Sequence, residues 1–66
     1  MPSMKLNELR AYVGDECEKA GGQVRYAKSI GISQSYLSAF LRGRQEPGPS
    51  FCEAVGVEKI VEYRLR

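Results

Sequence analysis

Apolar residues recur along this chain at helical spacing, in short segments that glycine or proline separates. Over residues 4–20 they form one stripe, made of Leu6, Leu9, Val13, Cys17 and Ala20. Ser3 is suited to cap the start of this first predicted helix, and Gly21 and Gly22 are suited to end it.

The second and third predicted helices cover residues 23–30 and 34–42. Gly31 can end the earlier helix, because glycine readily takes the left-handed conformation, and Ser33 can cap the later one. Their expected inward positions are apolar: Val24, Ala27 and Ile30 in one, and Leu37, Phe40 and Leu41 in the other.

Pro49 suits the first turn of a fourth helix, which Gly56 would end. In the last residues apolar and charged positions alternate, which predicts a strand, although a short fifth helix or a tail folded on the core remains open at this point. A lone strand has an unpaired edge, and the simplest partner is the same strand of a second copy. The expected dimer interface is Val61, Tyr63 and Leu65.

These elements predict a mainly α fold: four short helices with a central helix-turn-helix, and a C-terminal strand available for dimerisation. The 66 residues suffice for a single domain over residues 1–66. A domain of this size has a small core, so dimerisation would add useful burial.

The net charge of +2 is unevenly distributed along the chain. Residues 23–45 contain four cations, Arg25, Lys28, Arg42 and Arg44, and no acidic residue. A polyanionic partner would favour such a patch. Charge alone does not distinguish a binding patch from a solvated surface on which the charges are unevenly distributed by chance.

Residues 23–42 meet the structural demands of a helix-turn-helix, with a small residue at the helix crossing and a glycine at the turn. The segment resembles the helix-turn-helix of the phage repressor and Cro family. That pattern has Gln, Ala, Gly, an aliphatic residue and two apolar residues at the positions held here by Gln23, Ala27, Gly31, Ile32, Leu37 and Phe40.

The resemblance implies that the helix over residues 34–42 lies in the major groove of double-stranded DNA. The expected base contacts are Gln34, Ser35, Tyr36 and Ser38. The expected phosphate contacts are Gln23, Arg25, Lys28, Arg42 and Arg44, and the Gln23 side chain could also brace Gln34. Each of these residues also has a simpler interpretation as a solvated or surface-packed side chain.

The implied function is that of a Cro- or repressor-like transcription regulator, of phage or prophage origin, that binds a palindromic operator as a homodimer. The alternative is a helix-turn-helix antitoxin or adaptor whose main partner is another protein. An antitoxin can also bind its own operator, so the two assignments are not exclusive.

Catalysis is not expected, because the chain has no histidine, no nucleophile–base set and no phosphate-binding glycine loop. Cys17 and Cys52 are too few and too far apart for a metal site, and we expect no cofactor. Reduced, buried thiols are favoured over a disulfide, which remains formally open. With no secretory or membrane-spanning pattern, we expect a cytoplasmic protein in a bacterial or phage-infected cell.

Overall fold

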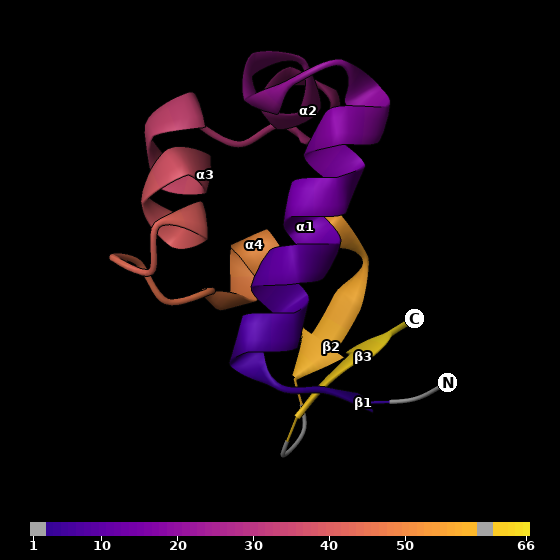
Figure 1. Cartoon of the computed structure of the whole chain (residues 1–66). Helices are drawn as coiled ribbons and strands as arrows, with labels where there is room; N and C mark the ends of the chain where they lie inside the picture. Colours follow the sequence, from indigo (N-terminus) through magenta and orange to yellow (C-terminus); the bar gives the residue numbers. More distant parts are fainter. Residues whose placement is uncertain (1–2, 60–61) are drawn as a thin grey trace.

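A computed structural model describes residues 3–59 and 62–66 of the chain, with four α-helices and a small three-stranded antiparallel sheet (Figure 1). The mainly α class is therefore confirmed. None of the helices described is long and apolar enough to cross a membrane. In chain order the elements are β1 (Ser3–Met4), α1 (Leu6–Ala20), α2 (Gln23–Ile30), α3 (Gln34–Leu41), α4 (Pro49–Val55), β2 (Val57–Lys59) and β3 (Tyr63–Leu65).

The turn between α2 and α3 has the local structure that the sequence predicts. Gly31 ends α2 with φ of 75°, and its backbone N–H donates to the Ala27 carbonyl. The hydroxyl of Ser33 accepts a hydrogen bond from the backbone N–H of Tyr36, 3.1 Å away, and so caps α3. Arg42 follows α3 as its C-cap residue, one position beyond the last helical residue.

The start of α1 differs from the prediction. Ser3 does not cap the helix, because Ser3 and Met4 form β1 and pair with β3. The N-cap residue is Lys5, whose backbone N–H donates to the Glu8 carboxylate over 3.1 Å. Ser3 and Met4 thus pair as a strand, although the apolar pattern of the helix is also compatible with Met4.

The C-terminal strand is not a lone strand, and this part of the prediction is wrong. The strand order is β1-β3-β2, so β3 is central and pairs on both sides within the chain. Its register places Tyr63 opposite both Met4 and Lys59. Both edges of β3 therefore already pair with strands of the same chain, and β3 needs no second copy as a partner. Of the expected interface residues, Tyr63 is buried, Leu65 is half-buried and Val61 lies outside the described residues.

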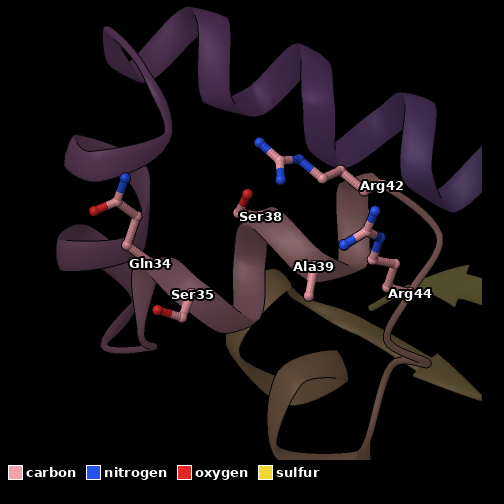
Figure 2. Close-up of a pocket in the computed structure, with 6 residues that line it drawn as sticks. All are labelled: Gln34, Ser35, Ser38, Ala39, Arg42 and Arg44. Atoms are coloured by element: carbon pink, nitrogen blue, oxygen red, sulfur yellow. The ribbon is translucent and has the colours of Figure 1, made fainter.

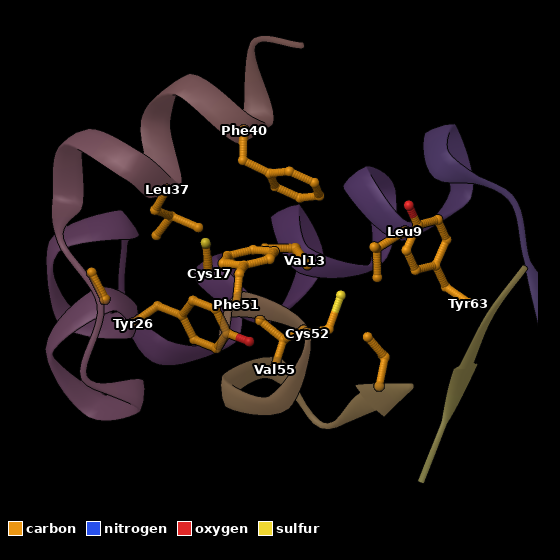
Figure 3. Close-up of a cluster of buried hydrophobic side chains, with 12 residues drawn as sticks. Leu9, Val13, Cys17, Tyr26, Leu37, Phe40, Phe51, Cys52, Val55 and Tyr63 are labelled. Carbon is orange, nitrogen blue, oxygen red and sulfur yellow. The ribbon is translucent and has the colours of Figure 1, made fainter. Parts of the chain in front are cut away.

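The core lies where α1 meets the other helices, and β2 and β3 close it from the far side (Figure 3). Phe40 is fully buried, and its ring centroid lies 4.6 Å from that of Phe51. Val24, expected inside, is 46% exposed, while Tyr26 on the same helix is buried. The hydrophobic core cluster is Leu9, Val13, Cys17, Tyr26, Ala27, Leu37, Phe40, Phe51, Cys52, Val55, Val57 and Tyr63.

Both cysteines belong to this core and are free thiols. Burial raises the pKa of the Cys17 thiol and of the Cys52 thiol above the ordinary value. The disulfide that the sequence left open is therefore absent from the structure.

Candidate nucleic-acid interface

The outer face of α3 forms one side of an open depression with a volume of about 340 Å³ (Figure 2). Gln34 and Ser35 lie at one end of it and Ser38 lies in the middle. The other end is occupied by the arginines that follow the helix. The lining residues are Gln34, Ser35, Ser38, Ala39, Arg42 and Arg44. The depression thus brings together three of the four residues expected to contact bases and two of the five expected to contact phosphates.

The inner side of α3 fixes which residues face this depression. Leu37 and Phe40 are fully buried against the core. Because residues three and four apart share a helix face, Ser35, Ser38 and Arg42 are turned to the opposite side. Packing of the apolar side therefore orients the polar side of α3, and the Ser33 cap sets where the helix begins.

The charged residues that line the depression, Arg42 and Arg44, are both cations. Arg42 and Arg44 are exposed, as are Arg25 and Lys28 on α2. Two ion pairs occur among the described residues, Glu16 with Lys19 and Glu58 with Arg64, and neither includes any of these four cations. The charge of the patch is thus not cancelled by a neighbouring carboxylate, and an anion could approach it at little desolvation cost.

The three expected phosphate contacts on α2 do not line the depression. Gln23, Arg25 and Lys28 are exposed on the neighbouring helix. The Arg25 side chain lies over Gly21, where its Cδ would be 3.2 Å from a Cβ at that glycine. The expected brace of Gln34 by the Gln23 side chain stays a prediction.

Tyr36 is placed differently from the other expected base contacts. Its hydroxyl donates to the carbonyl oxygen of Glu46, 2.8 Å away, and accepts from the backbone N–H of Gly48, 2.9 Å away. Its half-buried ring packs on Phe51, with centroids 5.4 Å apart. The side chain therefore joins α3 to the loop before α4 and does not line the depression.

Two residues of this region were missed by sequence reasoning. Ala39 lines the depression, and the helical spacing that selects Ser35 and Arg42 would also have selected it. Arg10 of α1 donates from Nε to the Phe40 carbonyl oxygen over 3.0 Å and so supports the end of α3. No local pattern around Arg10 indicates that contact, which joins residues thirty positions apart.

The arrangement offers hydrogen-bonding side chains on the outer face of α3 beside cations that form no ion pair among the described residues, which suits a polyanion whose polar groups those side chains can contact. Among the described residues, no group of three potential metal-ligating side chains gathers in one place. No protein-family model, curated protein or solved structure matches the chain.

Proposed function

We propose that this protein binds double-stranded DNA sequence-specifically and regulates transcription, with α3 in the major groove. The observation that carries the proposal is the depression on α3, where Gln34, Ser35 and Ser38 lie beside Arg42 and Arg44. An α-helix with its side chains is about 10–12 Å in diameter, so α3 can enter the major groove, which is about 12 Å wide. The chemistry and the dimensions of this surface both fit that ligand.

Within this proposal the side chains divide into two classes. The Gln34 amide can donate and accept at once, which matches the N6 and N7 edge of adenine, and Ser35 and Ser38 supply shorter hydrogen-bonding groups. Arg42 and Arg44 contact phosphates, which strengthens binding to all sequences alike. Gln23, Arg25 and Lys28 extend the phosphate contacts along α2.

We further propose that two copies bind a palindromic operator, with recognition helices about 34 Å apart in successive major grooves. The resemblance to the phage repressor and Cro family supports this dimer. Pairing through β3 is not available to this dimer, because β3 already pairs on both sides within the chain. A regulator of this kind would act in the cytoplasm of a bacterial or phage-infected cell.

Selection from a pool of random duplexes at about 150 mM salt tests the proposal, because non-specific phosphate binding is much reduced there. The expected result is a palindrome with half-sites about one helical turn apart. Enrichment of a single half-site would support sequence-specific binding and overturn the proposed dimer. No enrichment would overturn the proposal and direct attention to a protein partner.

A matched pair of variants connects that result to the depression. Ala39→Glu places a carboxylate among the residues that would face DNA, and this variant is expected to enrich no sequence. Ala11→Glu adds the same group to an exposed position on α1 and is expected to enrich the same sequence as the parent. Equal behaviour of the two variants would mean that DNA binds elsewhere on the chain.

A further inference from the structure

The loop between α3 and α4 is fastened to α3 at both of its ends. At its near end the backbone N–H of Arg44 donates to the Ala39 carbonyl oxygen over 2.9 Å. At its far end the Tyr36 hydroxyl bonds both the Glu46 carbonyl and the Gly48 N–H. Both anchors are on α3, so the path of the loop is set by the helix that carries the candidate base contacts.

Arg44, which lines the depression, is the residue at the near anchor, and its backbone begins the segment that runs to the Tyr36 anchor. Residues 44–46 are exposed, so burial does little to hold them in place. Pro47 of this loop is buried, but the exposed residues 44–46 would otherwise sample many conformations, and ordering them on binding would reduce affinity. A hydroxyl that bonds the loop on both its donor and its acceptor side removes much of that freedom before DNA arrives.

Both hydrogen-bonding functions of the Tyr36 hydroxyl are directed at the loop. To donate to a phosphate or to an acceptor on a base, its O–H would have to leave the Glu46 carbonyl. The expected DNA-contacting role of Tyr36 therefore competes with bonds that are already made.

We propose that Tyr36 is a positioning residue, whose hydroxyl holds the α3–α4 loop so that Arg44 faces the same depression as Gln34, Ser35 and Ser38. Tyr36 strengthens DNA binding through Arg44 and not by its own contact. This inference rests on the proposed function, because it concerns the affinity of that same surface for duplex DNA.

The test compares four proteins, the parent, Tyr36→Phe, Arg44→Ala and the double variant, on the selected duplex over a range of salt concentrations. Tyr36→Phe removes only the hydroxyl and retains the ring on Phe51. It is expected to weaken binding roughly three- to tenfold, which is the effect of losing one hydrogen bond that orders the loop. The slope of log K against log salt is expected to fall by up to about 0.9, the value of one phosphate contact.

The double variant decides between the two roles. If Tyr36 acts through Arg44, adding Tyr36→Phe to Arg44→Ala weakens binding no further. If Tyr36→Phe weakens binding equally with and without Arg44, or weakens it without changing the salt slope, the inference is overturned. If Arg44→Ala itself leaves the salt slope unchanged, the phosphate role in the proposed function fails instead.

Tyr12→Phe is the matched control, because it removes a hydroxyl that donates to Glu16 on α1, 3.3 Å away. It is expected to leave both affinity and salt slope unchanged. Hydrogen exchange of the Gly48 amide gives a second measurement that does not involve DNA. Exchange is expected to quicken in Tyr36→Phe while the amide of Leu37 keeps its rate, and an unchanged Gly48 rate would overturn the inference.

Discussion

Arg10 of α1 and Phe40 of α3 are joined twice. The Arg10 Nε donates to the Phe40 carbonyl oxygen over 3.0 Å, and the guanidinium carbon lies 5.7 Å from the centroid of the Phe40 ring. The last carbonyls of a helix lack intrahelical partners, and a cation at that end is favoured by the helix dipole. One side chain thus stabilises the C-terminal end of α3 from a different helix.

Replacing Arg10 by Met keeps an apolar stem and removes the donor and the charge. We expect the free energy of unfolding to fall by about 1–2 kcal/mol, the range for a hydrogen bond from a charged group that is partly exposed. In a domain of this size that lowers the melting temperature by roughly 4–8 °C per kcal/mol. Lys28→Met, an exposed cation on α2, is the control and should melt like the parent. Equal melting of both variants would contradict the structural role of Arg10.

Gln34→Ala removes the amide at the first position of α3. Under the proposed function it should relax base preference at one position of each half-site, at a cost of roughly 1–3 kcal/mol of binding free energy. Competition binding with single-base variants of the selected duplex measures this. Asn7→Ala, on an exposed part of α1, is expected to bind as the parent does. Full affinity of Gln34→Ala for its best site would remove Gln34 from the base-reading residues.

Arg42→Ala should weaken binding to all duplexes alike and reduce the salt slope by about 0.9, because a phosphate contact carries no base information. Salt titrations with the selected and a scrambled duplex provide the measurement. Lys59→Ala removes a cation from β2, which lies across α1 from α3 in Figure 1, and should change neither slope. A loss confined to the selected duplex would instead give Arg42 a role in base recognition.

Stability should fall at alkaline pH in part through Tyr26. Burial, with smaller contributions from Glu16, Tyr12 and Cys17, raises the pKa of Tyr26 to about 12 from an ordinary value of 10.0. The unfolded chain therefore loses this proton first, so the stabilisation is complete below pH 10 and is lost as pH rises toward 12. Denaturant unfolding across this interval should show a shallower decline for Tyr26→Phe than for the parent. Equal declines in the stability of the parent and of Tyr26→Phe would contradict the raised pKa of Tyr26.

The two thiols should be unreactive in the folded protein. Cys17 and Cys52 are buried, and burial raises the pKa of each thiol, so little thiolate is present at neutral pH. We expect alkylation of both at one common rate that follows global unfolding. Ser50→Cys, which places a thiol at an exposed position of α4, should react rapidly under the same conditions. Fast modification of either native thiol would show local opening of the core.

The helical part of the fold could be predicted because the signals are local. Gly31, Ser33 and Pro49 each act through the geometry of their own turn, and the structure places the element ends at or next to them. The same spacing identified the outer face of α3. Burial on α2 was harder, because Val24 and Tyr26 are two positions apart and point to nearly opposite sides of the helix, so only the surrounding packing decides which of them is covered.

The sheet and the loop could not be predicted because they depend on contacts between distant segments. Met4 becomes a strand residue only because Tyr63 lies beside it, and β2 is too short to show a period of its own. The bonds from Tyr36 to the loop likewise require the position of α4. The sequence identified Tyr36 as a polar residue near the reading face but could not give its partner.

The pairing of the first strand with the last also determines how the chain would respond to tension. Ser3 lies opposite Arg64 and Met4 opposite Tyr63, so the two described ends leave the ladder from the same side (Figure 1). A pull applied there would open β1 from β3 as a zipper, breaking one hydrogen bond at a time. The helices would bear load only after that separation, which makes this short ladder the mechanical weak point of an otherwise well-packed domain.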